Sequence, residues 1–152
     1  MLSEYVAEEL PGTPTDVHLR LGMPTQLKGR PPGWELERPY YLMTLQEADL
    51  VYRVGDVVHL CEFGVWRPQT KLGQLLVYRT LLPDTPGYLD TPLEAIRPRL
   101  VVGRHEPAVT AVADATGVDV EVWRRPRLDQ VIAQRTGYKP AQGIRIPRGE
   151  SS

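Results

Sequence analysis

The chain has 152 residues, of which 41% are hydrophobic and 24% are charged, and its formal net charge is −1. A chain of this size most simply forms one globular domain that buries its core without disulfides, so its single cysteine, Cys61, is expected to be a small buried apolar residue. No apolar run approaches the roughly 20 residues that cross a bilayer, and the N-terminus does not follow the pattern of a signal peptide.

The first segment of the chain, residues 1–34, is expected to lie outside the core. Residues 3–10 predict a short helix, which Pro11 and Gly12 end. From there to residue 33, recurring prolines and glycines predict an extended arm or a long loop with at most one turn. A loop of this length in a compact domain is usually functional or bound to a partner.

The core is expected between residues 35 and 125, where hydrophobic periodicity predicts regular elements. The order is three strands, a helix, a strand, a helix and a strand, at residues 35–45, 48–54, 57–66, 71–82, 97–104, 106–117 and 118–123. Gly55 marks a hairpin turn between the second and third strands. A short helix over residues 127–138 and an irregular tail are expected to complete the final segment, residues 126–152.

This order predicts an α/β fold with a mixed five-stranded sheet and flanking helices. The three consecutive strands indicate an antiparallel meander. The later strand–helix–strand unit, residues 99–123, should be a right-handed crossover that adds parallel strands.

The tail is basic. Residues 124–152 contain seven lysines and arginines against two acids, a balance that suits contact with nucleic acid or an acidic protein surface, although a merely solvated tail is the alternative. The side chains assigned to such contacts are Tyr78, Arg124, Arg125, Arg127, Lys139, Arg145 and Arg148.

Two carboxylates are predicted to meet at one edge of the sheet. Asp49 begins the second strand and Glu62 ends the third, so a hairpin places them side by side. Adjacent carboxylates repel each other unless a cation lies between them, and Mg²⁺ accepts such oxygen ligands while it keeps several waters. Asp49 and Glu62 are therefore the predicted metal ligands.

The helix that follows carries Lys71, Gln74 and Tyr78 at i, i+3 and i+7, which places them on one face. A cation, an amide and a phenol beside two carboxylates could bind a phosphate or a polar strand. We therefore include Lys71 and Gln74 with Asp49 and Glu62 as candidate catalytic residues.

With these residues the sequence resembles the PD-(D/E)XK nuclease superfamily over roughly residues 35 to 125. The segments "ADLVY", with Asp49, and "CEF", with Glu62, resemble the two acidic motifs of that family, and "GQLLVY" resembles its helix signature. The resemblance implies a restriction-endonuclease-like αβββαβ core with a further αβ unit. It also implies Mg²⁺-dependent cleavage of nucleic acid in members that keep the motif.

The motif departs from the family at one position. The family has a lysine two residues after the second acid, which orients the attacking water and stabilises charge in the transition state. This chain has Glu62-Phe63-Gly64, so a glycine stands where the lysine is expected. Loss of one preorganised donor can cost on the order of 3 kcal/mol of transition-state stabilisation. Lys71, or the arginine at 67, could supply the missing cation.

Two functions follow from this departure. The first is a non-catalytic nuclease-fold protein of the small phage or mobile-element type, acting as a structural component of a tailed-phage virion, either a head–tail connector or capsid-associated. The alternative is an active Mg²⁺-dependent DNA endonuclease. A nucleic-acid-binding module that uses only the basic tail is a third possibility.

The expected partners are other subunits of an assembly, among them copies of the chain itself, with DNA as a further partner. No membrane partner or nucleotide cofactor is expected, and no phosphate-loop or dinucleotide motif occurs. The expected location is the cytoplasm or a virion.

Overall fold

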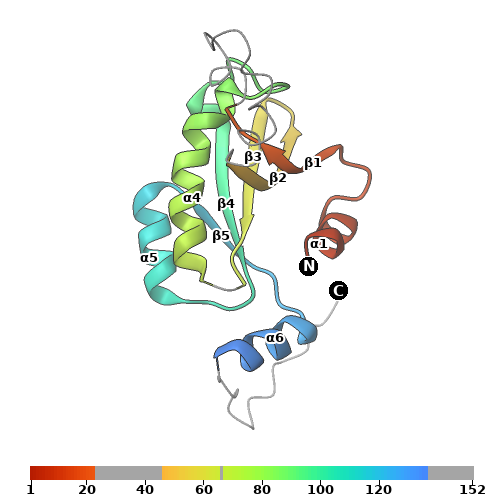
Figure 1. Ribbon diagram of the computed structural model, residues 1–152, viewed down its shortest axis with the longest axis vertical. Coiled ribbons are helices and arrows are strands. Elements are labelled where there is room, and N and C mark those ends of the chain that lie inside the picture. The colour runs from red at the N-terminus through yellow and green to blue at the C-terminus, as the bar shows by residue number, and fades with distance from the viewer. Residues whose placement is uncertain (23–45, 66, 137–152) are drawn as a thin grey trace, which may run out of the picture.

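The computed structural model describes residues 1–22, 46–65 and 67–136 (Figure 1). Its elements are α1 (Leu2–Glu9), β1 (Thr15–Arg20), β2 (Glu47–Val54), β3 (Val57–Phe63), α4 (Pro68–Leu81), the short 3₁₀ turns η2 (Leu82–Asp84) and η3 (Leu93–Ala95), β4 (Ile96–Val102), α5 (Pro107–Thr116), β5 (Asp119–Val122) and α6 (Pro126–Thr136).

The five strands form one sheet in the order β1-β2-β3-β4-β5. β1, β2 and β3 pair antiparallel, whereas β3, β4 and β5 pair parallel. Gly55, with φ of 58°, lies in the tight turn between β2 and β3, where a left-handed backbone favours glycine. The α/β class, the mixed five-stranded sheet and the parallel addition through α5 are thus confirmed.

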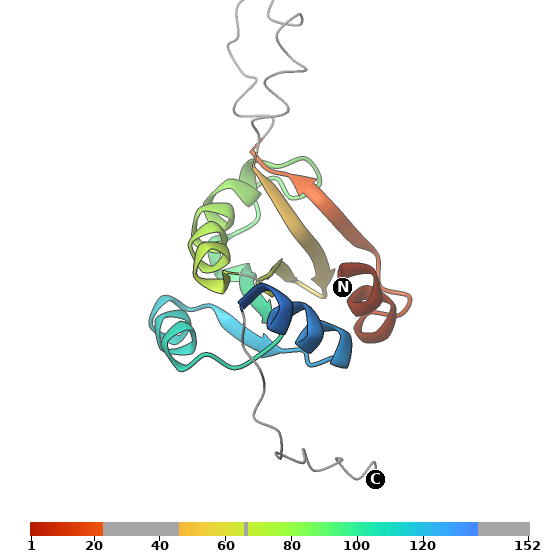
Figure 2. The same cartoon turned by 60° about the horizontal axis from the view of Figure 1, so that its bottom comes forward.

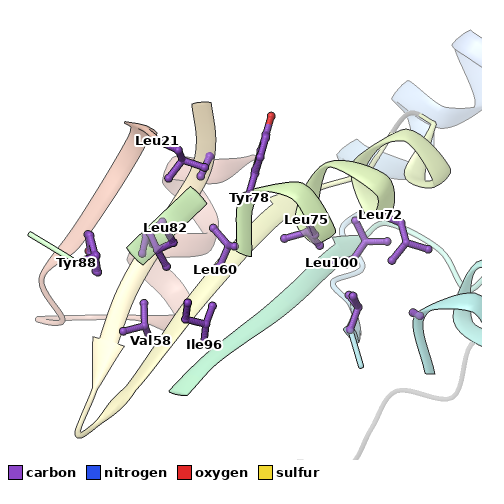
Figure 3. Packing of buried hydrophobic residues seen from close by; sticks show 14 of the residues in the cluster. Leu21, Val58, Leu60, Leu72, Leu75, Tyr78, Leu82, Tyr88, Ile96 and Leu100 are labelled. Carbon is purple, nitrogen blue, oxygen red and sulfur yellow. The ribbon is translucent and has the colours of Figure 1, made fainter. Parts of the chain in front are cut away.

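Helices cover both faces of the sheet. α4 and α5 lie side by side on one face, and α1 and α6 lie toward the other (Figure 2). The face under α4 and α5 holds the larger core, in which Leu72 and Leu75 of α4 lie over Leu60 and Leu100 of the central strands (Figure 3). Because β3 and β4 are covered on both faces over most of their length, most of their residues are apolar; the exceptions are His59, Glu62, Arg97 and Arg99.

The second core lies between the sheet and the helices α1 and α6. Its centre is Tyr5, whose ring meets Phe63 edge-on at 5.1 Å and Trp123 at 5.5 Å between ring centroids. Cys61 and Trp123 are buried in the same cluster. Cys61 is therefore the buried apolar residue that the sequence predicts.

The first strand of the meander differs from the prediction. Residues 15–20, which fall within the predicted arm, form β1 and pair with β2 along its length. β1 is an edge strand with mostly exposed side chains, so it needs few apolar residues. Only Val17 and Leu19 alternate with polar residues, and two such positions are too few to predict a strand. The strand predicted at 35–45 lies outside the described residues.

The terminal elements belong to the folded domain. α1 and α6 contribute Tyr5 and Leu128 to the second core, and α4 begins at Pro68, three residues before the predicted start. Proline suits the first turn of a helix because its missing N–H would have no partner there. Among the described residues, no helix is long and apolar enough to cross a membrane.

Two leucines test the location of the larger core. Leu75→Ala is expected to lower the free energy of unfolding by about 2–5 kcal/mol, because Leu75 is completely buried and the truncation leaves a cavity. Leu89 is 58% exposed, so Leu89→Ala should change the same quantity by less than about 0.5 kcal/mol. Urea unfolding of both variants measures the difference, and equal losses would contradict this description of the core.

Candidate functional site

The site forms where the ladder between β2 and β3 opens. Leu50 pairs with Cys61, but at the next position the carboxylates replace the backbone pairing. The Asp49 N–H donates to Glu62 Oε1 at 2.9 Å, and the Phe63 N–H donates to Asp49 Oδ2 at 2.9 Å. Each carboxylate therefore accepts a hydrogen bond from the backbone of the opposite strand, which fixes both side chains at this edge of the sheet.

Lys71 of α4 lies between the two carboxylates. Its ammonium nitrogen is 3.1 Å from Asp49 Oδ2 and 2.6 Å from Glu62 Oε2. Because both oxygens contact the same nitrogen, the carboxylates are near neighbours on the same side of the sheet. The predicted proximity of Asp49, Glu62 and Lys71 is what the structure shows.

Burial differs across this cluster. Glu62 is completely buried, whereas the side chains of Asp49 and Lys71 are 21% and 28% exposed. Burial and the charge of Asp49 raise the pKa of Glu62, and the hydrogen bonds from Lys71 and from the Asp49 N–H lower it, which leaves it at about 7. Burial lowers the pKa of Lys71, but its contacts with the two carboxylates outweigh this effect and raise it. Lys71 is therefore a cation at neutral pH.

The packing around Gly64 explains why the second motif ends in glycine. Its N–H donates to Val101 O at 2.8 Å, which continues the pairing of β3 with β4. A Cβ at this position would lie 3.0 Å from Pro68 Cα and 3.1 Å from Leu100 Cδ1, closer than ordinary van der Waals contact. The first turn of α4 thus rests directly on the strand end. Lys71 follows Pro68 by three residues, so the same close packing brings it to the carboxylates.

The other two candidate residues of α4, Gln74 and Tyr78, differ in their hydrogen bonding. The Oε1 atom of Gln74 is buried and has no hydrogen-bond partner among the described residues, which is unusual for a buried amide. Tyr78, predicted as a nucleic-acid or partner contact, is instead buried in the larger core with 3% exposure. Its hydroxyl points away from the surrounding leucines and donates to Gln46 Oε1 at 3.3 Å (Figure 3). No sequence pattern marks Gln46, which precedes β2.

The arginines predicted to contact nucleic acid or a partner differ in their surroundings. Arg125 pairs with Glu8 and Glu9 of α1 and stacks over the Trp123 ring at 4.3 Å, and Arg127 lies 3.4 Å from Glu4. Both guanidinium groups thus contact α1 near the end of β5 and the start of α6, while the side chain of Arg127 stays 81% exposed, and their role as nucleic-acid or partner contacts remains a prediction. Arg124 is exposed. Lys139, Arg145 and Arg148 lie outside the described residues.

The two carboxylates of Asp49 and Glu62 are oxygen donors of the kind that bind a hard divalent cation with few protein ligands. Among the described residues, no group of three or more histidine, cysteine or acidic side chains could hold a metal. Mg²⁺ often binds through one or two carboxylates and completes its coordination with water and substrate phosphate. Asp49 and Glu62 fit that description, with Lys71 as the counter-ion that a bound metal would displace.

Comparisons with known proteins give no functional assignment. No protein-family model and no curated protein matches the chain. A crystal structure titled as that of the protein of unknown function AF1548 is similar, with 14% sequence identity and a TM-score of 0.44 over 97% of this chain and 70% of that one.

Two glycines test the close packing of α4 on the strand end. Gly64→Ala is expected to lower the free energy of unfolding by about 1–3 kcal/mol, because the added methyl group must displace Pro68 or Leu100. Gly73→Ala is the matched control, because a Cβ there meets no atom of the described residues within 4 Å and alanine favours a helix; both variants are compared at a protein concentration low enough to exclude association. A neutral Gly64→Ala in chemical denaturation would contradict the packing.

The buried carboxylate makes stability depend on pH. The pKa of Glu62 is higher in the folded state than in the unfolded chain, so the folded state binds the proton more tightly. This tighter binding adds its full amount to the free energy of unfolding below the ordinary glutamate pKa, and the addition is lost as pH rises through about 7. Wild type should therefore lose stability relative to Glu62→Gln over this range, by on the order of 3 kcal/mol. Urea titrations at a series of pH values measure the difference, and parallel pH profiles would contradict it.

Removal of the Lys71 cation should make the loss of stability with rising pH steeper than in wild type, because ionised Glu62 then has no counter-ion. Lys71→Met leaves Glu62 buried without a counter-ion, which should cost about 3–5 kcal/mol above neutral pH and less as acid protonates Glu62. The exposed Arg97→Met, on β4, is the control and should be nearly neutral. A pH-independent loss in Lys71→Met would show that Lys71 acts only through packing.

Proposed function

We propose that this protein is a metal-dependent nuclease whose catalytic cation is supplied from helix α4. The observation that carries the proposal is the position of the Lys71 ammonium group, within 3.1 Å of Asp49 and 2.6 Å of Glu62. At position 64, where the nuclease motif has its lysine, a Cβ would lie 3.0 Å from Pro68 Cα, so a side chain fits there only if its neighbours shift. The charge that the motif requires is therefore present, but it comes from another element.

The order of elements supports the same proposal. From α1 to β5 the described elements run helix, three strands, helix, strand, helix and strand, the order that the PD-(D/E)XK resemblance implies, and α6 follows them. The first acid lies on β2, the second on β3, and the cation on the next helix. The superfamily membership proposed here rests on this placement and on the quoted motifs.

In this proposal Asp49 and Glu62 would hold the divalent cation, which supplies Lewis-acid activation of a phosphoryl oxygen and of water when bound. Lys71 keeps its proton at neutral pH, so it donates hydrogen bonds to phosphate oxygens as charge develops on them, and it does not act as a general base. The unpartnered Oε1 of Gln74 is an acceptor available to a water molecule or a substrate hydroxyl.

The proposed substrate is DNA. Asp49 and Lys71 form the partly exposed side of the cluster, so a phosphate can approach them without rearrangement of the core. Arg124 follows the end of β5 and begins the basic segment of residues 124–152, which suits a polyanion.

A second candidate function is the non-catalytic role in an assembly, as a head–tail or capsid-associated component of a tailed-phage virion. The observation that favours it is the complete burial of Glu62 with Lys71 as its direct counter-ion. Such a triad balances its own charge, and buried ion pairs of this kind also occur as purely structural features. Copurification with capsid proteins at fixed stoichiometry would support this role.

Cleavage of plasmid and single-stranded DNA tests the proposed function. With Mg²⁺ or Mn²⁺, wild type should cleave, and Glu62→Gln, Asp49→Asn and Lys71→Met should each lose about 100-fold or more in rate, because each removes a metal ligand or the cation.

The exposed residues Asp56 and Glu94 supply matched controls, since Asp56→Asn and Glu94→Gln remove a carboxylate far from the cluster and should cleave like wild type. No metal-dependent cleavage by wild type under any of these conditions would refute the nuclease and leave the assembly role.

A further inference from the structure

An uncharged, apolar groove runs along the outer surface of α4 and α5, away from the site. It has a volume of about 330 Å³ and is lined by Gln69, Leu72, Gly73, Leu76, Ala108, Val109 and Val112. Three apolar side chains on these helices are exposed to an unusual degree: Leu76 by 37%, Val77 by 52% and Val112 by 52%. The same surface therefore has a groove and also exposed apolar side chains that could fill the groove of another molecule.

The two helices expose almost no charge. Of their charged residues, Lys71 lies in the ion cluster and Arg79 donates to Leu93 O, so Asp114 alone is exposed. Asp114 follows Val112 by two residues and so does not share its face. A surface helix normally presents charged residues to solvent, and a face that lacks them is typical of a protein interface.

Two threonine hydroxyls of these helices have hydrogen-bond partners within the chain. The hydroxyls of Thr80 and Thr116 donate to carbonyl oxygens of their own helices, at Leu76 and Val112. At the rim, Gln69 Nε2 lies 3.5 Å from Glu106 Oε2. An apolar surface can therefore cover these two hydroxyls without leaving them unpaired.

Gly73 provides an independent indication of a partner. It lies in the middle of α4, where glycine lowers helix stability relative to alanine. A Cβ at this position would meet no atom of the described residues within 4 Å, and its backbone does not have the positive φ that favours glycine. Nothing within the described chain thus requires glycine here. Close approach by another molecule does explain it.

We propose that this face is a two-fold interface between two copies of the chain, with α4 and α5 of each copy packed across the groove of the other. An isologous contact brings a surface against itself, so a charged face repels and an uncharged face does not. The chain's own segment after residue 136 is a poorer occupant, because it carries Lys139, Arg145 and Arg148, no carboxylate is among the described residues that line the groove, and Glu106 at the rim already pairs with Arg104 at 3.1 Å.

The dimer leaves the carboxylate cluster open, because Lys71 and the groove residue Gly73 lie on different faces of α4. The interface is independent of the proposed function, since a nuclease and an assembly component could both use it.

Sedimentation velocity of the full chain over a wide concentration range tests the interface. Wild type should form dimers, and Gly73→Glu should weaken dimerisation about tenfold or more, because it places two carboxylates inside the contact. The substitution has room in the monomer, so its Tm at low concentration should not fall, which separates loss of the interface from loss of the fold. Val112→Glu should have the same effect on dimerisation.

The control is Val54→Glu, at a residue of β2 that is 55% exposed and lies on another surface. Its dimerisation should match that of wild type. A monomeric wild type at every concentration would overturn the proposal, as would dimers that persist in Gly73→Glu. Association of wild type only with a different protein, blocked by Gly73→Glu, would assign the groove to that partner and would equally overturn the dimer.

Discussion

The arrangement of the site depends on one ion cluster, in which the Lys71 ammonium group lies between the carboxylates of Asp49 and Glu62. Two carboxylates on neighbouring strands would repel each other, and one of them is completely buried. The lysine and the two backbone N–H groups of Asp49 and Phe63 offset that cost. This cluster therefore joins β2, β3 and α4 at the edge where the ladder between the strands opens.

The cluster depends in turn on the close packing of α4 at Gly64, where a Cβ would lie 3.0 Å from Pro68 Cα. Gly64 lets the first turn of α4 rest on the end of β3, and the next turn then carries Lys71 over the carboxylates. The glycine at position 64 and the place of Lys71 beside the carboxylates are thus two consequences of one geometry. In the proposed nuclease, Lys71 would supply from α4 the charge that the family motif supplies from the strand.

The sequence predicts the parts of the fold that local patterns encode. The β2–β3 hairpin, the α5 crossover and the two carboxylates follow from apolar periodicity and a turn glycine, and all are found. β1 could not be predicted, because an edge strand needs few apolar residues and its pairing with β2 is a tertiary effect. The ion pairs of Arg125 and Arg127 with α1 could not be predicted either, because they join segments that lie far apart in the sequence.

The most direct measurement of the central claim separates metal binding from cleavage. Mn²⁺ binding, followed by electron paramagnetic resonance in the presence of DNA, should be lost in Asp49→Asn and in Glu62→Gln. In Lys71→Met it should persist while cleavage is lost, because the variant removes a competing cation but keeps both carboxylates. Lys71→Met that cleaves DNA at the wild-type rate would contradict the assignment of Lys71 as the catalytic cation.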